Sequence, residues 1–167
     1  MKGTLTASAT GEALTLSAPL VTLGNGGRAA VIAPKGNLSV TSGAFVMSHD
    51  FSQLKAGGNL SIIAAQPTIN LTGELVVAGN VSVLNSGHIV SGNLRLNVLG
   101  AVSITSTGGN IDLRGGFLVS QGGALTLTAA AGSVFVGVTQ NTALYGNAVS
   151  LTAVSYTHLT LPTILLV

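Results

Sequence analysis

Three short stretches of the chain are nearly identical: Gly36-Asn37-Leu38-Ser39-Val40 (GNLSV), GNLSI at 58–62 and GNVSV at 79–83. In each stretch two aliphatic residues flank one serine, so that every second side chain is apolar. Alternation with a period of two is typical of a short β-strand that buries one face. Because this strand pattern returns at a nearly constant interval, the interval decides the fold.

The repeat extends in both directions from these three stretches. Aligned on the residue before the first aliphatic position, it begins seven times, with steps of 24, 22, 21, 21, 23 and 24 residues, at Ala13, Asn37, Asn59, Asn80, Ala101, Ala124 and Ala148. A regular period of this length is typical of solenoid proteins, in which each repeat forms one turn and packs on its neighbours.

Each repeat predicts up to three short strands. A second apolar pair follows ten and twelve residues after the start, at Ile69/Leu71, Ile111/Leu113 and Val134/Val136, with only Val90 in the repeat that starts at Asn80. A third follows sixteen and eighteen residues after the start, at Leu75/Val77, Leu96/Val98 and Phe117/Val119. Gly, Asn and Ser separate the strands as corners. We therefore predict an all-β, single-stranded parallel β-helix with 21–24 residues per turn and six to seven turns over residues 1–153.

Three asparagines occupy the same position in successive repeats, namely Asn37, Asn59 and Asn80. At a shared corner their side chains would stack and form a ladder of hydrogen bonds along the coil. Asparagine also tolerates the positive φ of a tight corner. The ladder is interpreted as structural.

The composition excludes several classes of protein. Only 6% of residues are charged, against roughly 25% in an ordinary soluble domain, yet no apolar run reaches the ~18 residues of a membrane-spanning helix. Six basic and four acidic residues are scattered singly for a net charge of +2, with 4% aromatic residues and no Trp, so we expect no nucleic-acid partner. With no cysteine, we predict no disulfide and no thiolate metal site, and we expect no cofactor.

One charged cluster is predicted. On the repeat, Glu74 and Arg95 fall at the same corner of adjacent turns, with Asp112 and Arg114 near that corner one turn on. The cluster could contact an anionic or hydroxyl-rich glycan. The alternative, which we favour, is a solvated ladder of salt bridges that contributes little to stability.

Other motifs are interpreted as structural. Ser48-His49-Asp50 has the residue types of a catalytic triad, but contiguous residues of an extended chain point to alternate sides, so a surface loop is expected. Gly24–Ala29 resembles a dinucleotide-binding loop, but Pro34 leaves no room for the helix that this loop requires, so a turn is expected. His88 is expected at an exposed corner and not as a metal ligand.

The GN-type units and the segment GAVSITSTGGNIDLRGGFLVSQGGALTLTAAAGSVFVG at 100–137 resemble the β-helical repeats of filamentous haemagglutinin-like bacterial adhesins and related surface exoproteins. The resemblance covers roughly residues 3–153 and does not include the secretion domain of that family. It implies a fragment of a long secreted or cell-surface shaft that attaches to host or surface glycans or proteins. Any export signal is expected upstream of Met1.

The last residues differ from the repeat. VSYTHLTLPT at 154–163 is similar to the in-frame translation of a sequencing-library adapter, read as its reverse complement. We therefore interpret 154–167 as a non-native tail of the kind found in metagenomic sequences. The alternative is a terminal strand, because His158-Leu159-Thr160-Leu161 alternates, although Pro162 would interrupt its hydrogen bonds.

Three functions remain open from the sequence. The first, which we favour, is a rigid adhesin-like shaft without catalysis in this segment. The second is a glycan-processing β-helix enzyme, a polysaccharide lyase or hydrolase, whose site would include Glu74 and Asp112. The third is a structural spacer without a ligand. No membrane insertion of this segment is expected, and the neighbouring turns of a longer chain are expected as packing partners.

Overall fold

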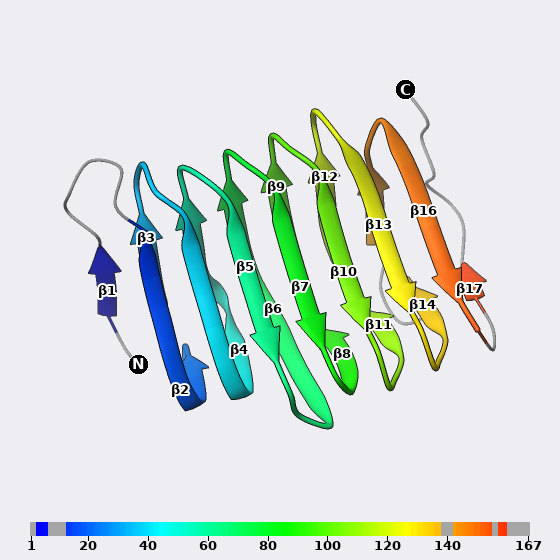
Figure 1. The fold of residues 1–167 in the computed structure, drawn as a ribbon, viewed down its shortest axis with the longest axis horizontal. Helices are drawn as coiled ribbons and strands as arrows, with labels where there is room; N and C mark the ends of the chain where they lie inside the picture. The colour runs from blue at the N-terminus through cyan, green and yellow to red at the C-terminus, as the bar shows by residue number, and fades with distance from the viewer. Residues whose placement is uncertain (1–2, 7–12, 138–141, 155–156, 160–167) are drawn as a thin grey trace.

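The computed structural model describes residues 3–6, 13–137, 142–154 and 157–159. In these ranges the chain forms seventeen β-strands of one hydrogen-bonded sheet, and no helix. Neighbouring strands run parallel, and the turns lie side by side in a row with β1 (Gly3–Thr6) at one end and β17 (Thr157–Leu159) at the other (Figure 1). The predicted parallel β-helix is confirmed. None of the described segments is a helix that could cross a membrane.

The coil has three faces, numbered in the order in which one turn passes through them. The first face holds β2 (Leu14–Leu23), β4 (Leu38–Ala56), β5 (Leu60–Ala64), β7 (Val81–Asn85), β10 (Val102–Ser106), β13 (Ala124–Ala129) and β16 (Ala148–Ala153). The second holds β6 (Thr68–Val77), β8 (His88–Ser91), β11 (Ile111–Leu113), β14 (Val134–Val136) and β17. The third holds β1, β3 (Ala29–Ala33), β9 (Leu94–Val98), β12 (Gly116–Ser120) and β15 (Thr142–Tyr145). The long strands β2, β4 and β6 continue around corners onto the following faces.

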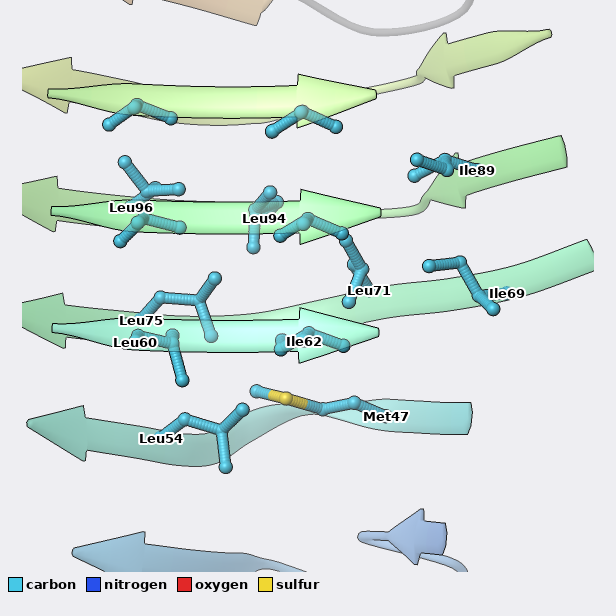
Figure 2. Close-up of a cluster of buried hydrophobic side chains, with 14 of the residues drawn as sticks. Met47, Leu54, Leu60, Ile62, Ile69, Leu71, Leu75, Ile89, Leu94 and Leu96 are labelled. Atoms are coloured by element: carbon cyan, nitrogen blue, oxygen red, sulfur yellow. The ribbon is translucent and has the colours of Figure 1, made fainter. Parts of the chain in front are cut away.

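Equivalent residues of successive turns stack in register. On the first face one outward column is a row of hydroxyl residues, at Thr15, Ser39, Ser61, Ser82, Ser103, Thr126 and Ser150. Most inward positions are hydrophobic and form one core along the axis of the coil (Figure 2). Each buried aliphatic side chain stabilises the fold by ~1.5–3 kcal/mol, and the alternation that the sequence predicts is what separates the two columns.

The second strand of the repeat that starts at Asn80 differs from the prediction. Ile89 is fully buried and lies in register between Ile69 and Ile111, whereas Val90 points outward. The expected inward position of Val90 is therefore wrong by one residue. The shift arises in the connection before the strand. Two residues, 86–87, join β7 to β8, whereas three residues, 65–67, join β5 to β6 in the preceding turn.

The third strand of the next repeat is also shifted by one residue. Phe117 and Val119 were expected in the core, but β12 buries Leu118 and Ser120 instead, and Phe117 is 48% exposed. The corner between Leu113 and Leu118 has four residues, where the corresponding corner between Leu71 and Leu75 has three. The extra residue turns the strand over, because a shift of one exchanges its two faces.

The asparagine ladder is present with a different chemistry from the expected one. The backbone N–H of Asn59 donates to Asn37 Oδ1, that of Asn80 to Asn59 Oδ1 and that of Ala101 to Asn80 Oδ1, each at 2.8 Å. Each side chain thus caps the backbone of the following turn instead of bonding to another side-chain amide. The asparagines do not use their tolerance of positive φ, since no described residue other than glycine has one.

Buried hydroxyls at the inner corners fall into two groups. Ser106 Oγ accepts from the backbone N–H of Gly109 at 3.0 Å, and its single proton lies within reach of the carbonyl oxygens of Gly87 and Gly109, at 2.7 and 2.8 Å; the contact with Gly87 joins two turns. Ser42 Oγ and Ser91 Oγ are buried without a hydrogen-bond partner. A buried hydroxyl without a partner destabilises the fold, whereas one that is bonded stabilises it.

The end of the described chain continues the coil. The backbone of Thr157–Leu159 pairs in parallel with Val134–Val136, with Phe135 and His158 at the same register position. Pro162 and the remainder of the predicted non-native tail lie outside the described residues. The origin of 154–167 stays a prediction.

Candidate functional site

The outward side of the third face carries charged, amide and aromatic side chains. A groove of about 450 Å³ runs across its strands and is lined by Glu74, Arg95, Leu96, Asn97, Phe117, Val119, Gln121 and Tyr145. We call these residues the third-face groove. They belong to β6, β9, β12, the corner after β12, and β15, so four successive turns contribute to it.

Strand register places these side chains in two columns. Glu74 pairs with Arg95, and Arg95 with Phe117, in the first column. Asn97 pairs with Val119, and Val119 with Tyr145, in the second. The columns are parallel to the axis of the coil, because equivalent residues of a parallel sheet stack directly from strand to strand. The groove therefore follows the long axis.

An aromatic pair forms one end of the third-face groove. The ring centroids of Phe117 and Tyr145 lie 5.0 Å apart, with an angle of 51° between the ring planes. This tilted geometry is favourable for two aromatic rings. Because the shift in β12 brings Phe117 to the surface, the pair offers an apolar surface to a ligand.

An amide pair lies beside the aromatic rings. Gln121 Nε2 donates to Asn97 Oδ1 at 2.8 Å, which joins the corner after β12 to β9 of the preceding turn. Both residues are exposed. Since each amide group has two N–H donors and one carbonyl acceptor, the pair retains donors and an acceptor for a ligand.

The charged members of the groove do not form an ion pair with each other. Glu74 Oε2 accepts a hydrogen bond from Gln53 Nε2 of the preceding turn. Arg95 is exposed, and among the described residues its guanidinium has neither a hydrogen bond nor a salt bridge. The carboxylate is thus engaged within the protein, whereas the guanidinium faces solvent.

Asp112 and Arg114 lie elsewhere. Arg114 Nε donates to Asp112 Oδ2 at 2.8 Å, and both residues line a separate hollow of about 230 Å³ on the second face. The predicted four-residue cluster is therefore divided between two faces, because Asp112 belongs to β11 while Glu74 lies on the part of β6 that reaches the third face. Glu74 and Asp112 do not line a common groove.

A second hollow continues the third face toward its N-terminal turns. It has a volume of about 350 Å³ and includes Lys55, Val76, Asn97 and Leu99 in its lining. Asn97 lines both hollows, so they are contiguous. A ligand that extends beyond the third-face groove would meet Lys55.

A second exposed aromatic residue lies at the corner between the second and third faces. Phe51 is 58% exposed, and its ring centroid lies 5.9 Å from that of His49 and 5.9 Å from the guanidinium carbon of Arg28. Ala29 N–H donates to the buried Ser52 Oγ at 3.1 Å, which anchors the segment. The sequence did not predict this cluster, because the repeat does not extend to the corner segment that holds Phe51.

Ser48-His49-Asp50 is part of strand β4 and not the expected loop. The register of β4 against β6 shifts between Ser48 and Gln53, so the segment bulges outward from the sheet. His49 Nδ1 accepts from the backbone N–H of Phe51 at 3.2 Å. The geometry gives His49 a local structural role.

His88 has a structural contact that the sequence did not predict. Its Nδ1 accepts from the backbone N–H of Asn110 at 2.9 Å, and Asn110 Oδ1 accepts from the backbone N–H of Ser133 at 2.9 Å. This second ladder uses the same geometry as the asparagine ladder. The sequence signal that could have revealed this ladder is the spacing of His88 and Asn110, which places them at the same corner of adjacent turns.

Two other predicted features concern cofactors and metals. Gly24 and Gly26 have positive φ, of 78° and 69°, and the chain continues into strand β3, so the expected turn at Gly24–Ala29 is confirmed. Within the described ranges no group of three or more His, Asp or Glu residues is placed to hold a metal ion.

Comparison of the chain with protein-family models, curated proteins and solved structures finds no match.

Proposed function

We propose that the chain is a rigid segment of a secreted or cell-surface bacterial adhesin-like exoprotein and that it attaches to surfaces through the third-face groove, without catalysis. The observation that supports this proposal most directly is the groove itself, which combines an aromatic pair, an amide pair and a solvent-facing guanidinium on consecutive turns. Such a combination of apolar surface and placed polar groups is typical of ligand sites. Host or surface glycans and proteins are the candidate partners.

The rod geometry supports this function. The first face stays in register from Thr15 to Ser150, so the coil holds its third face in a fixed orientation over its length. A rigid repeat array presents an extended surface at a constant spacing, which favours contact with long or repeated ligands. The sequence resemblance to adhesin repeats points the same way.

A glycan-processing activity has no specific support. Acid and base catalysis of glycoside cleavage needs two carboxyl groups on either side of one bond. Glu74 is bonded to Gln53 on the third face, and Asp112 is paired with Arg114 on the second face. We therefore propose no enzymatic role for this segment.

The test measures attachment and turnover together. The chain is applied to mucin, polysaccharide and epithelial-cell surfaces, and both bound protein and released reducing ends are quantified. We expect saturable binding to at least one surface without turnover. Turnover that disappears in the variant Glu74→Gln/Asp112→Asn would assign an enzyme, and the absence of both binding and turnover would assign a spacer.

A further inference from the structure

We propose that the third-face groove binds an extended acidic polysaccharide, a chain of pyranose rings that carry carboxylates. This inference rests on the proposed attachment function and adds the ligand class and the residues that recognise it. Three features of the groove correspond to the three chemical features of such a chain, which are apolar ring faces, hydroxyl groups and carboxylates.

The aromatic pair provides for the ring faces. A pyranose ring presents C–H groups on its faces, and these pack on aromatic rings because their contact removes apolar surface from water. Phe117 is exposed, and it lies with Tyr145 and the half-buried Val119 in the same part of the groove. Both residues lie on paired strands and their rings pack on each other, so their side chains lose little conformational freedom on binding.

The amide pair provides for the hydroxyl groups. Asn97 and Gln121 orient each other through their hydrogen bond of 2.8 Å. Both residues line the groove, and their mutual bond leaves N–H donors and the Gln121 carbonyl acceptor for a ligand. Neighbouring hydroxyls of a sugar ring, which both donate and accept, complement such a set.

Arg95 provides for the carboxylate. Its guanidinium has no acidic partner among the described residues, because Glu74 accepts from Gln53 on its other side. A guanidinium binds a carboxylate through two parallel N–H···O bonds. Lys55 in the contiguous hollow adds a second cation farther along the same face. The third face therefore offers two cations against one engaged carboxylate.

The direction of the groove favours a polysaccharide over a peptide. It crosses β6, β9, β12 and β15 along the coil axis, at ~4.8 Å per strand, which is comparable to the advance of a polysaccharide per sugar. An extended peptide binds most readily by adding a strand to a free sheet edge. The strands of the groove from β6 to β12 are paired on both sides, so this mode is closed to a peptide there.

The test is calorimetric titration of the whole chain with an oligogalacturonate hexamer, its methyl ester and a neutral cello-oligosaccharide of equal length. We expect the acid to bind about tenfold or more tightly than its ester. Phe117→Ala should weaken binding of both about tenfold. Arg95→Gln should lower the affinity for the acid most of the way to that for the ester, with Lys55 accounting for the remaining preference, and leave the ester unchanged.

Two matched controls separate the groove from general effects. Phe51→Ala removes an exposed aromatic ring, and Lys35→Gln removes an exposed charge, both outside the groove. Neither should change binding. Thermal unfolding of all four variants checks that the fold is retained, which is expected because the replaced side chains are exposed or half-exposed.

Each contrary result has a distinct meaning. Equal affinity for acid and ester, with no effect of Arg95→Gln, would overturn the acidic ligand. Binding that depends on Phe51 and not on Phe117 would overturn the groove. No sugar binding by a chain that still attaches saturably to surfaces would overturn this inference and leave the proposed function standing, whereas loss of attachment as well would overturn the proposed function itself.

Discussion

Asn59 Oδ1 accepts the backbone N–H of Asn80 at 2.8 Å, and this contact repeats above and below it along one corner of the coil. The side chain replaces a backbone acceptor where the strands of the first face begin. We expect Asn59→Ala to lower the free energy of unfolding by ~1–2 kcal/mol, because the N–H of Asn80 loses its partner. Asn59→Asp keeps an acceptor oxygen and should retain most of that stability. Chemical denaturation measures both, and equal loss in the two variants would contradict the ladder.

Gly79 lies directly before this ladder and has no room for a side chain. A Cβ at this position would overlap Asn59 Oδ1 and approach the carbonyl oxygen of Gly58 within 2.8 Å. Gly79→Ala should therefore destabilise the fold by ~1–3 kcal/mol through forced displacement of the ladder. Gly92→Ala is the matched control, since a Cβ there would come no closer than 3.3 Å to Thr72 Oγ1. A smaller effect at Gly79 than at Gly92 would contradict the close stacking.

Two buried serines should respond in opposite ways to the same substitution. Ser106→Ala removes the contact with the Gly87 carbonyl oxygen, which joins two turns, and the hydrogen bonding with Gly109 within its own turn, and should cost ~1–2 kcal/mol. Ser91→Ala removes a buried hydroxyl that has no partner, and should leave stability unchanged or raise it by up to ~1 kcal/mol. Thermal unfolding of the two variants is compared. A loss at Ser91 equal to that at Ser106 would show that its hydroxyl is bonded.

Strand β12, in which the inward and outward side chains are exchanged relative to the prediction, gives a direct test of register. Leu118 is fully buried while Phe117 is 48% exposed. Leu118→Ala should cost ~2–5 kcal/mol, whereas Phe117→Ala should cost under ~1 kcal/mol. Urea denaturation distinguishes them. If Phe117→Ala is the more destabilising, the register expected from the sequence alone is the real one and the groove loses its aromatic pair.

The second ladder can be tested at His88. His88→Ala removes the Nδ1 acceptor of the Asn110 N–H and should cost ~1 kcal/mol. His88→Asn supplies the side chain that performs the same task at the other corner, and should restore stability. Hydrogen exchange of the Asn110 amide provides the local readout. Fast exchange in wild type would contradict the contact.

The sequence predicts the fold of this chain because repetition amplifies a weak signal. One GNLSV stretch could belong to any strand, but seven aligned starts fix the period, the parallel pairing and the first face. Where the spacing changes by one residue, prediction fails. The short connection before Ile89 and the long corner before Leu118 each exchange inside and outside, and a count from the start of the repeat does not detect a compensating change at a corner.

The candidate site could be predicted only in part from the sequence, because the same changes of spacing at corners decide which side chains point outward. Glu74 and Arg95 are neighbours because both lie on the regular third strand. Phe117 was expected in the core, so its pairing with Tyr145 was invisible. Asp112 and Arg114 were expected near Glu74, yet the corner between them and the third face separates the two pairs. Side-chain facing at corners depends on three-dimensional packing and not on the repeat.

Pulsed electron spin resonance measures most directly whether the turns stack in register as a straight rod. Because the chain has no cysteine, spin labels are placed at Ser39→Cys with Thr126→Cys, at Ser39→Cys with Ser150→Cys, and at Thr15→Cys with Ser150→Cys. These pairs lie four, five and six strands apart in one outward column. We predict mean distances that increase by ~5 Å with each added strand, from ~19 to ~29 Å. Distances that do not increase with strand number, or that scatter broadly, would contradict the rod.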